Sequence, residues 1–184
     1  SAECAEQRYG IHADMTTYAK ALRTVYPVAC FGGRADVMDV IGAGGGVVHG
    51  GPYTANLVAL SAANATLDIL ANTDALHTVA RAGAAIRDVL GRVFTAADQP
   101  HCFAGPASMF GVHLGETVPT NYRDWRATAS ALYTAFAWQL IDHGVMLEPD
   151  SREPWFICEA HSSVDLGWLE DMATQSLRKA LDAS

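Results

Sequence analysis

Lys20 is the residue whose type and setting point most clearly to chemistry. Of the twelve Lys and Arg residues in the chain, only Lys20 and Lys179 are lysines. Lys179 lies in an amphipathic C-terminal segment, where a solvated cation is expected. Lys20 has apolar neighbours in the segment DMTTYAKALRTVYPVACFGG. Because apolar surroundings disfavour the ammonium form of a lysine, Lys20 is a candidate for Schiff-base chemistry. The competing interpretation is a surface lysine that extends into solvent.

The other polar residues predict no second reactive centre. The seven histidines do not stand beside another ligand type at the spacing of a metal site, so we expect no metal ion. The glycine-rich segment GAGGG (42–46) lacks the Lys-Ser/Thr pair of a phosphate-binding loop. We therefore interpret it as a loop.

Length and charge limit the class of protein. The chain has 184 residues, 50% of them hydrophobic, and a net charge of −8. An acidic chain without a basic cluster argues against nucleic acid or an anionic membrane as a partner. No apolar run is long enough to span a membrane. The four cysteines are far apart and form no C-x-x-C pair, so we expect reduced thiols in a cytoplasmic protein.

The elements that must position Lys20 fall into two parts. Residues 1–95 combine glycine-rich loops with long helices, and the helix expected at 55–71 is apolar nearly all round, which predicts burial. Residues 96–184 form a small α/β unit. Its expected elements are a strand with Phe110, Val112 and Leu114 on one face, a helix over 122–143 ended by Gly144, strands at GVML and WFIC, and a helix over 164–182. A further strand is expected at YPVACF (26–31).

Several segments resemble one known family. The stretch around Lys20, together with HGGPYTANLVALSAANATLDIL, is similar to the active-site region of the class III pyridoxal-phosphate-dependent aminotransferases, in particular the glutamate-1-semialdehyde 2,1-aminomutases. Asp14, Lys20 and Pro27 stand in the register of that family. FGGRADVMD resembles its next block, and GVMLEPDSREPWFICEAHSSVD resembles its C-terminal domain.

The resemblance implies a fold and a domain plan. The fold is α/β, that of a fold-type I pyridoxal-phosphate-dependent transferase. Members of the family are much longer than this chain, so the chain resembles their C-terminal half. Residues 1–95 then form the end of the large cofactor-binding domain, and residues 96–184 form the small C-terminal domain. The resemblance also implies a homodimer, or a missing N-terminal half as partner.

The resemblance assigns roles to single residues. Lys20 is implied as the catalytic Schiff-base lysine that holds pyridoxal 5′-phosphate and shuttles a proton. Gly51, Tyr53 and Thr54 are implied as further cofactor contacts. Glu153 is implied near the substrate, an amino acid or amino aldehyde.

Structural interpretations compete with some of these roles. Glu153 is equally well explained as a solvated carboxylate in a loop. A helix N-cap explains Thr54, or the nearby Asn56, as well as an interface motif does.

The chain also departs from the family pattern. Arg23, Thr24 and Val25 stand where the family has three glycines, Pro52 replaces a threonine, and Ser1 stands where an aspartate is expected. We therefore expect little transaminase activity from these 184 residues alone. The alternative is a truncated or degenerate relative that is not catalytic and acts as an assembly partner. A small-molecule-binding domain without pyridoxal phosphate is a third possibility.

Overall fold

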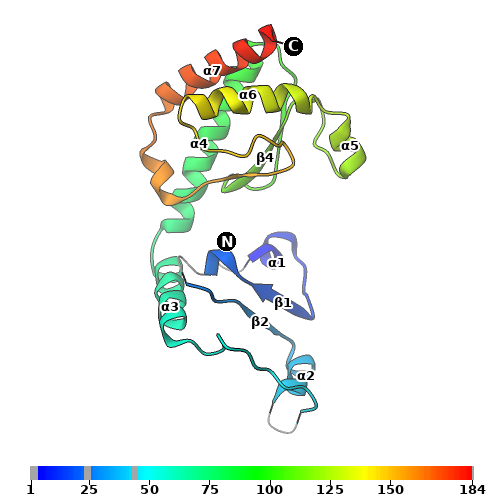
Figure 1. The fold of residues 1–184 in the computed structure, drawn as a ribbon, viewed down its shortest axis with the longest axis vertical. Helices are drawn as coiled ribbons and strands as arrows, with labels where there is room; N and C mark the ends of the chain where they lie inside the picture. The colour runs from blue at the N-terminus through cyan, green and yellow to red at the C-terminus, as the bar shows by residue number, and fades with distance from the viewer. Residues whose placement is uncertain (1–3, 23–25, 43–44, 184) are drawn as a thin grey trace. The chain divides into compact units, whose positions relative to one another are not determined.

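The computed structural model describes all residues except 1–3, 23–25, 43–44 and 184, and the chain forms two compact units (Figure 1). The units are Ser1–Leu76 and His77–Ser184. The division thus lies within the first turn of the long helix α4 (Ala75–Ala96), and the apolar face of α4 packs into the core of the second unit. The division after residue 95, which follows the family's domain plan, stays a prediction about the whole protein.

The first unit contains a two-stranded antiparallel sheet. Strand β1 (Met15–Tyr18) pairs with β2 (Cys30–Gly33), so that Met15 lies opposite Gly33. Of the strand expected at YPVACF, only the end is extended as a strand, and β1 was not predicted. The remaining elements of this unit are α1 (Cys4–Tyr9), the 3₁₀ turns η1 (Lys20–Leu22) and η2 (Asp39–Ile41), and the helices α2 (Ala35–Met38) and α3 (Leu57–Asn72).

Helix α3 confirms the helix expected from residue 55 onward, but the predicted burial is wrong. Asn56 starts the helix, because its side-chain oxygen accepts a hydrogen bond from the Ala59 N–H at 3.0 Å. Ala59 and Ala63 are its buried residues, whereas Leu57 is 79% exposed. Within this unit, the described residues therefore pack only against the face of α3 that carries Ala59 and Ala63, and the rest of the apolar helix stays exposed.

The second unit packs helices against a three-stranded antiparallel sheet of order β3-β4-β5. Helices α6 and α7 lie side by side in it (Figure 1). Its elements after α4 are β3 (Cys102–Ala104), β4 (Met109–His113), α5 (Tyr122–Arg126), α6 (Ser130–Asp142), β5 (Trp155–Phe156), the 3₁₀ turn η3 (Glu159–Ser163) and α7 (Leu166–Asp182).

The core of this unit is continuous. The predicted inward face of β4 is confirmed, because Phe110, Val112 and Leu114 are all buried. They meet the buried stripe of α4 and the aromatic side chains of α6, and Phe94 lies edge-on to Phe136 with ring centroids 5.4 Å apart. A core of this kind positions the loops around it.

Two local predictions for the second unit need correction. The helix expected over 122–143 is interrupted between α5 and α6, where Ala129 donates its N–H to the Leu114 carbonyl. Gly144 ends α6 as predicted, with φ 89°, and Val145 donates back to Leu140. The expected strand GVML is not a strand, because this segment leaves the helix end as a loop. None of the helices in the described part of the chain has the length and hydropathy needed to cross a bilayer.

Candidate functional site

Lys20 lies at the junction between a strand and a turn. It follows β1 closely, opens η1 and is exposed. Its φ of 47° is in the left-handed region, which costs a non-glycine residue about 1–2 kcal/mol. Backbone conformations of this kind are concentrated at functional sites. The turn η1, which begins at Lys20, packs against α3.

The opposite end of β1 is fixed by Asp14 and Arg34. The Arg34 guanidinium donates to the Asp14 carboxylate at 2.6 Å, and the Arg34 backbone N–H donates to the Asp14 carbonyl at 3.1 Å. Gly33 permits this approach, because a Cβ there would lie 2.2 Å from the Asp14 carbonyl oxygen. Arg34 also binds Asp36 and thereby lowers the pKa of that carboxyl. The segment FGGRAD thus anchors the strand that carries Lys20.

A cavity of about 240 Å³ lies at the first turn of α3. Besides Lys20, three residues were predicted to contact the cofactor, and two of them, Tyr53 and Thr54, line this cavity. His49 lines it as well. Gly51 does not line it; its carbonyl accepts the Thr54 N–H at 3.0 Å and closes the turn. Asn56 is the N-cap of α3, so the hydroxyl of Thr54 is not needed for capping. His49 was not predicted; its ring lies edge-on to Phe31, 5.2 Å between centroids.

The residues of this unit fit part of a pyridoxal-phosphate site. A lysine suits covalent attachment, although Lys20 is not among the residues that line the cavity, and the hydroxyls of Tyr53 and Thr54 with the imidazole of His49 suit an anionic group. Pro52 is exposed in the turn and has no N–H to donate. The other departures, Ser1 and residues 23–25, lie outside the described residues.

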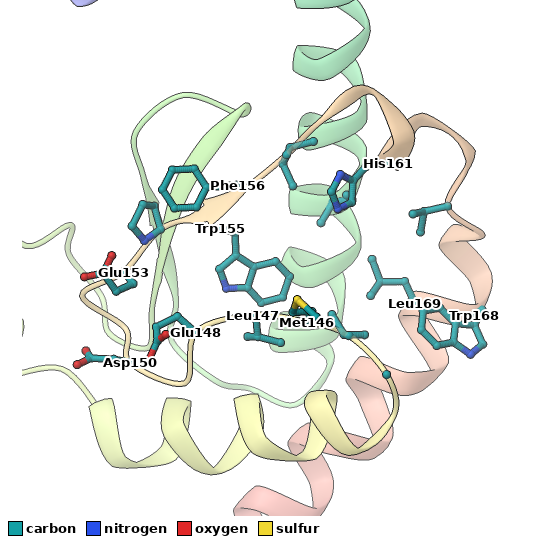
Figure 2. Close-up of a pocket in the computed structure, with 16 residues that line it drawn as sticks. Met146, Leu147, Glu148, Asp150, Glu153, Trp155, Phe156, His161, Trp168 and Leu169 are labelled. Carbon is teal, nitrogen blue, oxygen red and sulfur yellow. The ribbon is translucent and has the colours of Figure 1, made fainter. Parts of the chain in front are cut away.

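Glu153 lines a larger groove in the second unit, of about 810 Å³. In Figure 2, Trp155 stands at its centre and the carboxylates of Glu148, Asp150 and Glu153 gather toward one end. The other end is largely apolar and includes Trp168. The structure therefore places Glu153 in a groove, as part of an acidic group rather than alone.

The loop that carries Glu153 is fastened to α6. Trp155 donates its indole N–H to the Tyr133 hydroxyl at 2.9 Å, and Tyr133 in turn donates to the Glu148 carbonyl at 3.2 Å. Thr134 donates to the Pro149 carbonyl at 2.9 Å. Burial raises the pKa of Tyr133 to about 12, so this hydroxyl stays neutral and acts as a structural link.

A second set of contacts fastens the same loop to α5. Trp125 donates its indole N–H to the buried Ser151 hydroxyl at 2.8 Å, and the Arg152 guanidinium lies over the Trp125 ring. Arg152 also pairs with Asp150 and lowers the pKa of that carboxyl. The Asp150 carbonyl accepts the Glu153 N–H at 3.0 Å. No local sequence signal links Trp125 to Ser151, so these positioning residues were not predicted.

Comparisons with known proteins identify the family of the chain. The family model for aminotransferase class-III matches residues 3–163. The glutamate-1-semialdehyde 2,1-aminomutase of Laribacter hongkongensis is 32% identical over 177 residues, which cover 95% of this chain and 41% of that protein. The chain thus spans about two fifths of the length of that curated relative.

Solved structures show the same fold. An omega-transaminase from Sphaerobacter thermophilus superimposes with a TM-score of 0.82 at 24% identity, covering 96% of this chain and 41% of that one. The FumI protein of Sphingopyxis sp. MTA144, solved in a pyridoxal-phosphate internal aldimine form, gives a TM-score of 0.80 at 22% identity, covering 97% and 40%. These likenesses confirm the predicted fold, that of the C-terminal part of a fold-type I transferase. With most of its length matched by the family model, the chain belongs to the class III aminotransferases.

Proposed function

We propose that this chain carries part of a pyridoxal-phosphate-dependent site for amino-group transfer, with Lys20 as the covalent attachment point. The observation that carries the proposal is the setting of Lys20, in a left-handed conformation directly after an anchored strand. The substrate class that we propose is a small amino acid or amino aldehyde. The unpaired thiols of Cys30 and Cys102 support a reducing, cytoplasmic setting.

We assign the roles of the chain's own residues by resemblance to the family. Pyridoxal phosphate, when bound, supplies the electron sink for the reaction. Lys20 would hold the cofactor covalently and would move the proton of the substrate carbon. Tyr53 and Thr54 would hold the phosphate through their hydroxyls, while Gly51 shapes the turn that carries them. By the same resemblance we propose Glu153 as a substrate contact.

This proposal requires contributions from outside the chain. Pro52 offers no donor, and each missing charge-assisted hydrogen bond weakens binding by roughly 1.5–3 kcal/mol. We propose that a further N-terminal part or a second subunit supplies the remaining contacts, and that the 184 residues alone turn over little substrate. Turnover at the usual enzymatic rate by these residues alone would contradict this.

The exposed side of α3 favours a second candidate function. Leu57, Leu67 and Ile69 are exposed on a helix of a unit that buries little. Apolar patches of this kind mark protein interfaces, so a non-catalytic assembly partner is the alternative. Under either function we expect self-association, which Ile69→Asp should weaken in light scattering, whereas Asp88→Asn, at an exposed position of α4, should not. A clean monomer at micromolar concentration would contradict the interface.

Reductive trapping tests the attachment point. The protein is incubated with pyridoxal phosphate, reduced with borohydride and mapped by peptide mass spectrometry. We expect the adduct on Lys20, lost in Lys20→Arg and retained in the matched variant Lys179→Arg. An adduct spread evenly over both lysines would favour the assembly partner over the enzyme.

A further inference from the structure

A second groove of the second unit lies along α4 and has a volume of about 480 Å³. One face of α4 lines it, together with Phe103 on β3 and Ala107 in the loop after β3. This loop is pressed against the helix, because a Cβ at Gly83 would lie 1.9 Å from the Ala107 carbonyl oxygen. The volume falls in the range of about 300–1,000 Å³ that is usual for small-molecule sites.

Arg87 is a half-buried charge in this groove. Its guanidinium carbon lies 5.0 Å from the centroid of the Phe103 ring and 5.6 Å from that of Phe110. One of its N–H groups donates to the Gly105 carbonyl over 3.4 Å. Stacking on rings occupies the face of a guanidinium and leaves its N–H edge for other partners. Within the described part of the chain, no carboxylate pairs with Arg87, so most of its donors remain for a ligand.

The second guanidinium of the groove is already balanced. Arg92 donates to the Glu170 carboxylate at 2.5 Å, which raises the pKa of Arg92, and the charge of Asp88 adds to this effect. Arg87 is thus the guanidinium of this groove that no described carboxylate balances. Because Asp88 also lines the groove, it would repel a ligand that carries more than one negative charge.

We propose that this groove binds a small monocarboxylate with an apolar or aromatic body, and that Arg87 receives the carboxylate. The fork of a guanidinium matches the two oxygens of a carboxylate. The ring of Phe103 and the methyl groups of Ala84 and Ala107 offer an apolar surface to the body. The inference does not rest on the proposed amino-transfer function, because these residues lie in the second unit and Lys20 lies in the first.

Titration with benzoate tests the site. Benzoate is added to the isotope-labelled protein of 184 residues, and the backbone amide signals are followed by NMR. We expect saturable shifts around Arg87, Gly91 and Phe103, and none in the first unit. The absence of saturable shifts around Arg87 would contradict the proposal.

Two further probes test the ligand class. Benzamide has nearly the same shape without the charge and should bind about tenfold more weakly, because charge-assisted hydrogen bonds are the stronger ones. Inorganic phosphate should also bind more weakly than benzoate, because it carries more charge and has no apolar body. Equal affinity for benzamide would reduce the groove to an apolar surface, and tighter binding of phosphate would overturn the proposed class.

A matched pair of arginines tests the receiving group. Arg87→Gln should weaken benzoate binding at least about tenfold, because the charge and its fork are lost. Arg81→Gln, at an exposed arginine of the same helix, should leave the affinity unchanged. Unchanged affinity in Arg87→Gln would show that Arg87 does not receive the carboxylate.

A second pair of variants tests the groove while keeping Arg87, which also packs on two aromatic rings. Ala84→Leu fills the groove from an exposed position of α4 and should abolish benzoate binding, and leucine is a good helix former. Ala80→Leu, one turn earlier and outside the groove, should leave binding unchanged. Thermal unfolding by circular dichroism checks that each variant is folded. Retained binding in folded Ala84→Leu would place benzoate elsewhere and overturn the assignment.

Discussion

The two units of this chain differ in how much of their apolar surface they bury. The second unit encloses side chains from three helices and a sheet, among them Leu90, Phe110 and Phe136, all with no exposed surface. The described residues of the first unit bury only Ala59 and Ala63 among their hydrophobic side chains. The hydrophobic term that stabilises a domain grows with the apolar area removed from water. The second unit therefore has a core of its own, whereas the first depends on ion pairs, turns and a short sheet.

This difference bears on function. The proposed attachment point, Lys20, lies in the unit with little core, whereas Glu153 lies in a groove fastened to a complete core. A catalytic lysine needs a fixed position, so the first unit has to gain rigidity from contacts outside the described residues. We therefore expect core substitutions to lower the stability of the second unit strongly, and substitutions in the first unit to have only local effects.

The largest expected effect comes from a matched pair of leucines. Leu90→Ala removes a fully buried side chain from α4 and should destabilise the second unit by about 2–5 kcal/mol. Leu57→Ala, at a side chain that is 79% exposed, should change the free energy of unfolding by no more than about 0.5 kcal/mol. Denaturant unfolding followed by circular dichroism measures both. Similar losses for the two variants would break the comparison.

The next largest effect is expected in the first unit, where two neighbouring glycines should differ in how much stability their replacement costs. A Cβ at Gly33 would lie 2.2 Å from the Asp14 carbonyl, whereas a Cβ at Gly32 would meet nothing within 4 Å. Gly33→Ala should therefore cost about 1–3 kcal/mol of local stability, by analogy with overpacked sites. Hydrogen exchange of the β1–β2 amides should rise sharply in Gly33→Ala and little in Gly32→Ala. The second unit should show unchanged exchange in both variants.

The sequence predicts best where a local pattern is enough. The alternation Phe110, Val112, Leu114 predicts the inward face of β4, and Gly144 predicts the end of α6. These features depend on neighbours within a few residues. The expected strand GVML fails because its residues lead into a segment whose carbonyls are bonded by side chains from α6, which no local pattern records.

In the candidate site, too, some residues could be predicted from the sequence and others could not. Tyr53 and Thr54 were predicted by resemblance and do line one cavity, and His49 joins them from a loop without a recognisable spacing. The positioning contact between Trp125 and Ser151 joins residues 26 positions apart. The burial of α3 was overestimated because apolar composition reports what a helix can bury, not whether a partner surface is present.

A smaller effect is expected at the loop that carries Glu153. Trp125→Phe keeps an aromatic ring for Arg152 but removes the N–H that Ser151 accepts. Losing one buried hydrogen bond should cost about 0.5–1.5 kcal/mol. Thermal unfolding measures this, and Tyr122→Phe, which alters an exposed ring beside Trp125, is the control. If the two variants melted together, Trp125 would not hold the loop.

The smallest expected effect concerns a single proton in the core. His113 is buried on β4, its Nδ1 has no hydrogen-bond partner among the described residues, and burial lowers its pKa below the usual 6.5. The unfolded chain therefore binds a proton at His113 more readily than the folded chain does. The contribution of neutral His113 to the free energy of unfolding is complete above about pH 6.5 and is lost as the pH falls from there toward the lowered pKa.

We expect the second unit to melt at a lower temperature at pH 5.5 than at pH 7.5. The exposed carboxyls with lowered pKa, such as Asp150, lose their contribution only at more acidic pH, so they do not account for a difference within this window. In His113→Gln the difference between the two pH values should disappear, even if the variant is less stable throughout. A difference that persisted unchanged in His113→Gln would assign it to another group.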